Sequence, residues 1–534
     1  MVFESANDMF IVDAGLMFPD DDMLGIDFII PDYSYVCEKK DKLRGIIITH
    51  GHEDHTGALP FLLKQVGTRC PVYGTSLTLG LIKEKLNEYG IKDVQLKRVH
   101  AREMVDFGDF RVEFIKVTHS IAGGLGLGIM TPVGRVIHTG DFKFDLSPVD
   151  GEGIDFYKFA QYGEHGVLLM LSDSTNAEHE GFTLSERKVR VAFEGIFSKA
   201  DGRIIIATFA SNIHRIQQAI DVAVEFGKKV ILCGRSIVSN ANIATDLGYL
   251  KVPANTLYRI EQINTLNPRK VVIITTGSQG EPMSVLTRIA CDTHKYIKIE
   301  QGDTVVVSAK VIPGNEKAVG RTIDRLFKRG ANVVYEKVSD IHVSGHGSTE
   351  ELKLMLNIVR PKYFVPIHGE YRHLVSHARL AEGVAIQKEN IFIMQNGDVL
   401  GIDTGFVGVT NHVQAGRIFI DGKNSSDINN NAILKERKRL ARGGFITVMV
   451  SINKETGGII QGPEILYKGF IFDETSQDVI NEAKTIIVDI INNGENRTYK
   501  DITQVELKVQ SALKKFLRNK LDKRPLILPI IVEK

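Results

Sequence analysis

Short apolar runs separated by Gly- and Asp-rich breaks fill the first third of the chain. Runs of this length, bounded by turn residues, predict β-strands. An amphipathic segment at 77–90 predicts one of the few intervening helices. The predicted strands lie at 9–15, 43–49, 71–74, 110–117, 134–141 and 166–173.

From about residue 186 the pattern changes to a strict alternation of strand and helix. An apolar run such as GRIIIATF at 202–209 is followed by helical periodicity, as in NIHRIQQAIDVAVEFG at 212–227. This alternation is typical of βαβ units on a parallel sheet. A helix at 349–360 and a strand at 363–369 follow, and the mixed pattern of the first third then resumes. The second unit is therefore predicted to be inserted within the first.

A polar, charged stretch at about 421–445 predicts an exposed connection between separate cores. Beyond it, a small α+β unit is expected, with one helix at about 476–492 and another starting at a capping box of Thr503 and Glu506. The first domain is predicted to consist of two parts, 1–185 and 349–425, with an inserted domain at 186–348 between them. A linker at 426–445 and a C-terminal domain at 446–534 are predicted to follow.

The composition describes a globular chain without a global charge signature. Its 534 residues are 43% hydrophobic and 25% charged, which suits several packed cores and excludes a disordered or collagen-like protein. Lys and Arg number 66 against 65 Asp and Glu, a formal net charge of +1. A polyanionic partner would therefore have to meet locally concentrated positive charge. Basic segments at 435–442 and 514–524 are candidates for such contacts, or are simply solvated helix faces.

The cysteines and the apolar runs bear on the cellular compartment. The cysteines are far apart and form no CxxC pair, which favours a reducing cytosol. No apolar run approaches the ~20 residues that span a bilayer, and the acidic start MVFESANDMF does not resemble a signal peptide. We therefore expect a cytoplasmic protein with no membrane partner. The four cysteines are Cys37, Cys70, Cys233 and Cys291.

The densest chemical signal is the segment ITHGHEDHTG, which places His50, His52, Asp54 and His55 between a predicted strand and a predicted helix. Histidines at i and i+2 on an extended loop can converge on one ion, while the following Asp and His face a second ion. Imidazole nitrogens and carboxylate oxygens are the usual ligands of catalytic zinc. The alternative is a His-rich surface loop, but this dense spacing at a strand end favours metal binding.

Further candidate ligands stand at the ends of other predicted strands, namely His119, Asp141 and His368. Together with the HxHxDH segment they complete a set of seven ligands for two metal ions. Asp141 is the natural bridging group, because a carboxylate has lone pairs for both ions. Asp13, which ends the strand MFIVD, is predicted to orient the histidine loop without binding metal itself.

These motifs resemble a known family. HxHxDH with a later His and Asp is similar to the metallo-β-lactamase fold, and the insertion with SDSTN (172–176), HVSGHGS (342–348) and PIHGEYRH (366–373) resembles its nucleic-acid-processing β-CASP branch. LMFPDDDMLGIDFIIPD, HTGDFKFD, TTGSQGEPM, IPGNE and the ending RPLILPIIVEK resemble bacterial ribonuclease J from Asp13 onward. The resemblance implies an αββα metallo-β-lactamase sandwich, an inserted parallel α/β β-CASP domain and a small α+β C-terminal domain.

The chain departs from the family pattern in two places. Ribonuclease J usually begins with an extra strand and a Gly-rich loop of the type GGxGEIGKN, whereas this chain begins at MVFE. One N-terminal edge strand is therefore expected to be missing from the first domain. The family also commonly has Pro-Asp after THSI, where this chain has Ala122 and Gly123.

The resemblance implies a ligand set and a mechanism. One ion would be held by His50, His52 and His119, the other by Asp54, His55 and His368, with Asp141 shared. The expected cofactor is two divalent ions per subunit, zinc first, with manganese or magnesium as alternatives. Asp54 is also expected to take part in catalysis.

Two further residues are expected to complete the catalytic set. His346 would protonate the departing 3′ oxygen, and Asp173 would orient its imidazole. The alternative for His346 is a plain turn residue among glycines.

The resemblance also implies a site for the 5′-terminal phosphate. Its expected residues are Ser211 and Asn212 at a helix start and the loop His342, Val343, Ser344, Gly345 and His346. Backbone N–H groups beside glycine and at a helix N-terminus attract anions. Plain N-capping is the alternative for Ser211 and Asn212.

The function implied is a metal-dependent ribonuclease with 5′→3′ exonuclease and endonuclease activity in mRNA decay and rRNA maturation. The expected partners are RNA with a 5′-monophosphate, a second copy in a homodimer or homotetramer, and a paralogous subunit or RNA-degradation complex. One alternative is a structural subunit supporting an active paralogue, which the seven intact ligands argue against. A small-molecule metallo-hydrolase is the other, and the β-CASP-like insertion and HVSGHGS argue against it.

Overall fold

The structure is a computed structural model and describes residues 1–20, 22–281, 283–312, 314–336, 341–422, 431–469, 476–492 and 502–534. Its residues fall into two compact units. Unit 1 comprises Met1–Met17 and Ile30–Arg417, and unit 2 comprises Phe18–Ile29 and Ile418–Lys534. Within the part of the chain that the structure describes, no helix is both long and apolar enough to cross a membrane.

Two β-sheets pack face to face in unit 1. Apolar side chains of both sheets, among them Phe10, Ile47, Phe114 and Leu127, fill the space between them. The first sheet has the order β1 (Val2–Glu4), β2 (Met9–Val12), β4 (Leu43–Ile47), β5 (Val72–Gly74) and β6 (Leu96–Arg98). The second has the order β18 (Pro361–Ile367), β11 (Val167–Asp173), β10 (Gly134–His138), β9 (Leu125–Thr131), β8 (Phe110–Lys116) and β7 (Met104–Phe107).

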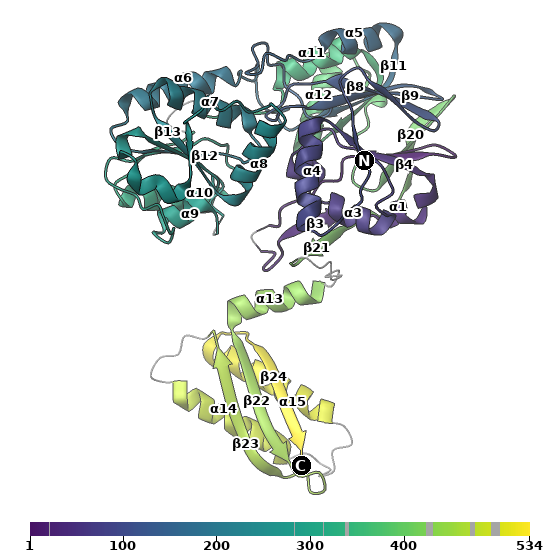
Figure 1. Ribbon diagram of the computed structural model, residues 1–534. Helices are drawn as coiled ribbons and strands as arrows, with labels where there is room; N and C mark the ends of the chain where they lie inside the picture. The colour runs from purple at the N-terminus through teal and green to yellow at the C-terminus, as the bar shows by residue number, and fades with distance from the viewer. Residues whose placement is uncertain are drawn as a thin grey trace. The chain divides into compact units, whose positions relative to one another are not determined.

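Helices cover the outer faces of these two sheets (Figure 1). The six-stranded sheet packs through Met170 and Phe364 against apolar side chains of α5 (Phe156–His165), α11 (Thr349–Val359) and α12 (Tyr371–Gly383). The helices α1 (Ser34–Glu38), α3 (Leu59–Val66) and α4 (Ser76–Glu88) lie on the side of the five-stranded sheet, where α4 contacts β5 and β6. The layers are therefore helix, sheet, sheet and helix, as predicted.

The edge strand β1 was not anticipated from the sequence. It pairs antiparallel with β2, with Phe3 opposite Phe10. The two rings stack 5.0 Å apart.

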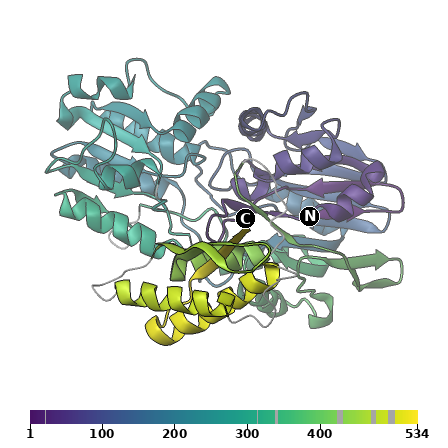
Figure 2. The same ribbon diagram turned by 90° about the horizontal axis from the view of Figure 1, so that it is seen from below.

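A parallel six-stranded sheet is inserted between β11 and β18, which pair parallel with each other. Its apolar side chains pack on one face against α6 (Arg187–Lys199), α7 (Ile213–Glu225) and α8 (Arg235–Asp246), and on the other against α9 (Val285–Ala290) and α10 (Glu316–Lys328) (Figures 1 and 2). The predicted insertion of βαβ units is confirmed. The strand order is β14 (Leu257–Tyr258), β13 (Lys229–Cys233), β15 (Val271–Thr275), β12 (Ile204–Ala207), β16 (Thr304–Val307) and β17 (Asn332–Val334).

Unit 2 is built on a three-stranded sheet in the order β23 (Ile459–Lys468), β22 (Phe445–Ile452) and β24 (Leu526–Glu533). The helices α14 (Ser476–Asn492) and α15 (Ile502–Leu521) pack against this sheet, and Figure 2 shows them in yellow-green and yellow. The helix predicted at 476–492 is confirmed. Thr503 is the second residue of α15 and not its N-cap, so the predicted capping position is wrong.

Shorter elements complete the two units. Of the connection expected at 426–445, residues 426–430 lie outside the described residues, and the helix α13 (Asn431–Gly443) occupies most of the rest. Unit 2 also includes Phe18–Ile29, where the Asp27 N–H donates to the Ile420 carbonyl (2.9 Å). The remaining elements are β3 (Phe28–Pro31), β19 (Asp398–Asp403), β20 (Phe406–His412), β21 (Arg417–Ile420), the one-turn α2 (Glu53–Thr56) and short 3-10 helices at Lys40–Lys42, Ile260–Thr265, Pro268–Lys270 and Lys388–Asn390.

Candidate metal centre and catalytic site

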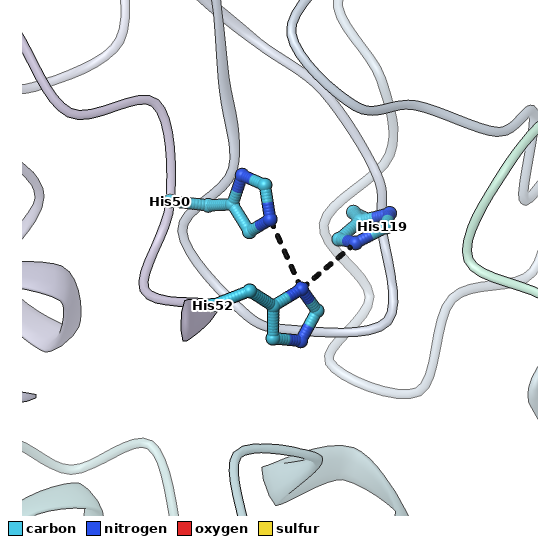
Figure 3. A group of neighbouring side chains, drawn as sticks. All are labelled: His50, His52 and His119. Carbon is cyan, nitrogen blue, oxygen red and sulfur yellow. Dashed lines mark hydrogen bonds between the residues drawn. The ribbon is translucent and has the colours of Figure 1, made fainter. Parts of the chain in front are cut away.

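Three histidines from two loops converge beyond the end of β4. His50 and His52 follow this strand, and His119 follows β8. The Nδ1 atom of His52 lies 3.0 Å from His50 Nε2 and 3.1 Å from His119 Nε2 (Figure 3). Nitrogens about 2.1 Å from one tetrahedral zinc ion stand roughly 3.4 Å apart, so this spacing is close to that of a ligand set.

The three imidazoles are held in their neutral form. Burial, together with the neighbouring histidines, lowers the pKa of His50 and of His119 well below the usual value, and burial lowers the pKa of His52 to about 4. A neutral imidazole has a free lone pair on one ring nitrogen, which is the form that binds metal. His119 Nδ1 lies 2.7 Å from the Gly345 carbonyl, to which it donates, and this leaves Nε2 free to act as a ligand.

A second group of side chains gathers around Asp141. The ligand atoms of Asp54, His55, Asp141 and His368 all lie within 4.8 Å of one another. The Oδ2 atom of Asp141 is 3.2 Å from Nε2 of His55 and 3.2 Å from Nε2 of His368. Asp54 is the most exposed member, with half of its side chain open to solvent.

Asp141 also connects the two groups. Its Oδ2 lies 3.8 Å from His50 Nε2 and 3.9 Å from His119 Nε2, so one carboxylate oxygen is near four of the histidines predicted as ligands. Although burial opposes ionisation, His368 and His55 hold the pKa of Asp141 well below its usual value. The seven residues predicted as ligands therefore lie together, and Asp141 occupies the position between the groups.

The donor set fits divalent metal ions. All seven side chains offer imidazole nitrogen or carboxylate oxygen, which suits zinc and other divalent first-row metals. Within the described part of the chain, the Nε2 atom of His55 is buried and makes no hydrogen bond, although a buried polar atom normally has a partner. A metal ion between His55 and Asp141 would give this nitrogen the partner it lacks.

Asp13 positions the histidine loop from behind, as predicted. Its Oδ2 lies 2.7 Å from His55 Nδ1, and its Oδ1 accepts a hydrogen bond from the Thr49 N–H (2.8 Å). His55 therefore turns Nε2 toward Asp141. Asp13 and His368 both have positive φ values, +62° and +54°, which are uncommon for non-glycine residues.

His346 and Asp173 form a hydrogen-bonded pair beside both groups. His346 Nδ1 lies 2.7 Å from Asp173 Oδ2, and Asp173 is 1% exposed. Burial opposes a charged imidazole, but Asp173 raises the pKa of His346 above its usual value. The ring of His346 lies 4.9 Å from that of His119 and 5.6 Å from that of His368.

The loop that carries His346 is fixed by its backbone. The His346 carbonyl accepts hydrogen bonds from Asn176 Nδ2 (2.9 Å) and Thr183 Oγ1 (2.8 Å). At position 345 only glycine fits, because a Cβ there would stand 2.6 Å from His119 Cε1. This turn therefore brings the loop directly against the group of His50, His52 and His119.

The other residues predicted to bind substrate differ in their surroundings. His342 is near Arg215, Lys310 and Lys143, and burial together with these cations lowers its pKa to about 3. Its Nδ1 is buried and has no hydrogen-bond partner among the residues that the structure describes.

The side chain of Val343 is 4% exposed and belongs to the core of the inserted domain, so its side chain is not available to a substrate. Ser344 Oγ accepts a hydrogen bond from Asn176 Nδ2 (2.7 Å). Of the loop residues, His342 is therefore the one with an unsatisfied buried polar atom in positive surroundings.

Asn212 is the N-cap of α7, and its Oδ1 accepts a hydrogen bond from the Arg215 N–H (3.0 Å). Asn212 therefore caps the helix, which was the alternative to phosphate binding for this residue. The neighbouring Ser211 is half-buried.

Glu351 is a supporting residue that the sequence reasoning missed. It is fully buried, and its carboxylate accepts hydrogen bonds from the backbone N–H groups of Phe144 (2.6 Å), Thr183 (2.6 Å) and Ser348 (2.8 Å). The three bonds join the segment after Asp141 to the end of the His346 loop. The spacing of Ser348 and Glu351 fits a capping box, and this pattern could have pointed to Glu351 from the sequence.

Family models match four parts of the chain. They are the beta-lactamase superfamily domain at 25–153, the ribonuclease J beta-CASP domain at 201–326, the Zn-dependent metallo-hydrolase RNA specificity domain at 330–394 and the ribonuclease J C-terminal domain at 432–534. These matches confirm the predicted fold class.

Curated relatives match over nearly the whole length. Ribonuclease J 1 of Streptococcus pyogenes is 42% identical over 99% of this chain and 94% of that protein. Ribonuclease J2 of Bacillus subtilis is 39% identical over 100% of this chain and 95% of its own length. Ribonuclease J of Helicobacter pylori is 38% identical, covering 99% of this chain and 76% of that protein. On this similarity, and with its clustered histidines and aspartates, the chain belongs to the ribonuclease J family.

Proposed function

We propose that this chain degrades RNA from a 5′-monophosphorylated end, and also cuts internally, with two divalent ions bound at the paired groups. As a member of the ribonuclease J family the chain is a metal-dependent ribonuclease, a hydrolase that acts on the ester bonds of RNA. The observation that carries the proposal of two ions is the position of Asp141, whose Oδ2 lies within 3.9 Å of four histidine nitrogens from both groups.

The proposed ligands divide between the two ions. His50, His52 and His119 hold one ion, and Asp54, His55 and His368 hold the other, with Asp141 shared. Divalent ions at such a site supply a nucleophile at neutral pH and neutralise charge on the phosphodiester. Zinc is proposed first, because the donors are mainly imidazoles, with manganese and magnesium as alternatives.

The proposed proton donor is His346. Its pairing with Asp173 favours a protonated imidazole that is ready to protonate the departing 3′ oxygen. Hydrolysis then leaves a 3′-hydroxyl on one product and a 5′-phosphate on the other. Half of the Asp54 side chain is exposed, and Asp54 is proposed to contribute to catalysis besides holding metal.

The proposed phosphate site consists of Ser211, Asn212 and the loop His342–His346. Support comes from the positive surroundings of His342 and from its unpartnered buried Nδ1. Val343 would contribute only its backbone, since its side chain is in the core. The global charge of +1 does not oppose RNA binding here, because the positive charge is local.

We also propose the domain division 1–185, 186–348, 349–425, 426–445 and 446–534. The family-model match at 201–326 lies inside the proposed insertion, while the match at 432–534 begins earlier than 446 and takes in α13.

Other aspects of the function rest on the family resemblance. A cytoplasmic location suits the four free cysteines. Roles in mRNA decay and rRNA maturation, a homodimer or homotetramer, and partners among paralogous subunits or RNA-degradation complexes are proposed on the same resemblance.

The alternatives are less well supported. A purely structural subunit is not favoured, because all seven ligand side chains are present and converge. A small-molecule hydrolase would have no use for the domain matched by the RNA specificity model.

The test is hydrolysis of 5′-labelled RNA that bears a monophosphate or a triphosphate, with and without chelator. We expect release of labelled mononucleotide that favours the monophosphate and stops with chelator. Metal content should fall in His368→Ala and stay unchanged in the control His412→Ala, an exposed histidine distant in sequence from the ligands. Full activity after chelation, or in His368→Ala, would contradict the assignment of two metals.

A further inference from the structure

A buried arginine in the inserted domain stands out because the proposed chemistry does not use it. Arg215 lies in α7 and is 0% exposed. Its guanidinium forms a bidentate pair with Glu186, from Nη2 to Oε1 (2.9 Å) and to Oε2 (2.9 Å), with Nε to Oε2 at 3.3 Å. A fully buried charge is tolerated only when it is paired and hydrogen-bonded, so this position is specified by its partners.

The remaining nitrogen of Arg215 holds the start of the His346 loop. Nη1 donates to the carbonyl of Ile341 (3.2 Å) and to Ser308 at its carbonyl (3.0 Å) and hydroxyl (2.9 Å). Ser308 Oγ donates to the same Ile341 carbonyl (2.6 Å). Ile341 immediately precedes His342, so Arg215 and Ser308 fix the residue at which the proposed phosphate-binding loop begins.

The backbone of Arg215 serves the other half of the proposed phosphate site. Its N–H donates to Asn212 Oδ1 (3.0 Å), the bond that caps α7. Arg215 therefore contacts Asn212 through its main chain, and through its side chain it contacts Ile341, the residue that precedes the His342–His346 loop. Arg215 and Ile341 are 126 residues apart in the sequence. The relative placement of the two segments therefore depends on tertiary contacts of this kind.

The same network continues toward the metal centre. The Glu186 N–H donates to Asp145 Oδ2 (3.1 Å), and the Asp145 N–H donates to Thr118 Oγ1 (3.4 Å), next to His119. At its other end the loop meets His119 directly, through the Gly345 carbonyl. Both ends of the loop are thus tied to the segment that carries a proposed metal ligand.

We propose that Arg215 is a positioning residue that sets the distance between Asn212 and the His342–His346 loop, and thereby the recognition of a 5′-terminal phosphate. The inference rests on the phosphate site of the proposed function. Arginine is required because its planar group presents donors in three directions at once, to Glu186, Ser308 and Ile341. Lysine keeps the charge but has a single nitrogen and cannot reach all three.

The experiment compares Arg215→Lys with the wild type on RNA of one sequence that carries either a 5′-monophosphate or a 5′-hydroxyl. We expect KM for the monophosphate to rise roughly tenfold, about the loss of one hydrogen bond to the substrate. The KM for the hydroxyl RNA, the kcat at saturation and the metal content should stay within about twofold of wild type. A general loss of structure would change all four together.

Arg203→Lys is the matched control. Arg203 is also a buried arginine of the inserted domain, paired with Asp303 (Nη2 to Oδ2, 2.6 Å; Nε to Oδ1, 3.0 Å) and donating to the Lys298 carbonyl (2.6 Å). It contacts neither Asn212 nor Ile341. We expect a comparable drop in the thermal midpoint with no change in the ratio of the two KM values.

The outcomes separate this inference from the function on which it rests. A wild type that does not distinguish the two RNA ends overturns the phosphate site, and the role of Arg215 with it. A wild type that prefers the monophosphate, with the preference intact in Arg215→Lys, overturns the role of Arg215 alone. Should Arg215→Lys fail to fold, Ser308→Ala removes only the Oγ contacts to Arg215 and Ile341, and it should lower the preference two- to fivefold. An unchanged preference there also refutes the inference.

Discussion

Acid should destabilise the protein partly through one buried histidine, His377 on α12. The residue is 0% exposed, its Nδ1 lies 3.0 Å from Ser174 Oγ, and its ring packs at 4.8 Å on Phe364. Ser174 Oγ donates to the Ser172 carbonyl, so it accepts the hydrogen bond from His377 Nδ1. The Nε2 atom of His377 is buried and has no hydrogen-bond partner in the described ranges, so a proton there would be neither solvated nor hydrogen-bonded.

The size of the effect follows from the pKa of His377. Burial, slightly offset by Asp173, lowers this pKa from 6.5 to about 3. Between these two pH values the unfolded chain binds the proton and the folded chain does not, so the free energy of unfolding falls as the pH falls below 6.5. At pH 5 the window covers about 1.5 pKa units, and at about 1.36 kcal/mol per unit the loss is about 2 kcal/mol.

The assay is urea unfolding at pH 7.5 and pH 5.0 with chelator present, so that proton competition at the metal ligands is the same in both proteins. In His377→Asn the amide keeps the donor toward Ser174 but cannot titrate. The variant should be less stable at both pH values, because ring packing is lost, yet its loss between them should be about 2 kcal/mol smaller than in wild type. The exposed His100→Asn is the control and should behave like wild type. An equal loss in wild type and His377→Asn would refute the reasoning.

Three other substitutions test the remaining parts of the site. His346→Ala should lower turnover by about 10²- to 10⁴-fold with unchanged metal content by elemental analysis; loss of metal would contradict its role as proton donor. Gly345→Ala places a Cβ against His119 and should reduce metal stoichiometry, a reading that full occupancy would disprove. Glu351→Gln turns an amide N–H₂ toward the backbone N–H donors of Phe144, Thr183 and Ser348. It should lower the free energy of unfolding, measured by denaturant titration, by about 2–4 kcal/mol. A change under ~0.5 kcal/mol would exclude a supporting role for Glu351.

The proposed metal ligands could be picked out from the sequence because their signal is local. His50, His52, Asp54 and His55 lie within six consecutive residues after one strand. His119, Asp141 and His368 each follow a strand of the six-stranded sheet, so the fold brings them to the same region once the strand order is known. The inserted βαβ units could also be predicted from the sequence, since buried parallel strands appear as continuous apolar runs.

What the sequence did not reveal depends on contacts between distant residues. Glu351 hydrogen-bonds to Phe144, which is 207 residues away in the sequence, and Arg215 hydrogen-bonds to Ile341, which is 126 residues away. No periodic pattern in the sequence predicts either pair. The strand β1 has only three residues and is too short for an alternating pattern to be recognised. Val343 was assigned to substrate binding from its motif, but its place in the core depends on the packing of the inserted sheet.

The insertion explains why the proposed catalytic acid and the proposed metal ligands lie in separate parts of the sequence and still meet. The chain leaves the sandwich after Asp173 and returns through Ile341, so His346 stands on the returning segment and its partner Asp173 on the departing strand. Glu186 on the outgoing side and Ile341 on the incoming side are held by the same guanidinium of Arg215. The pair His346–Asp173 therefore joins the returning segment to the departing strand. We therefore expect that unfolding of the inserted domain would separate His346, the proposed proton donor, from Asp173 and from the proposed metal ligands.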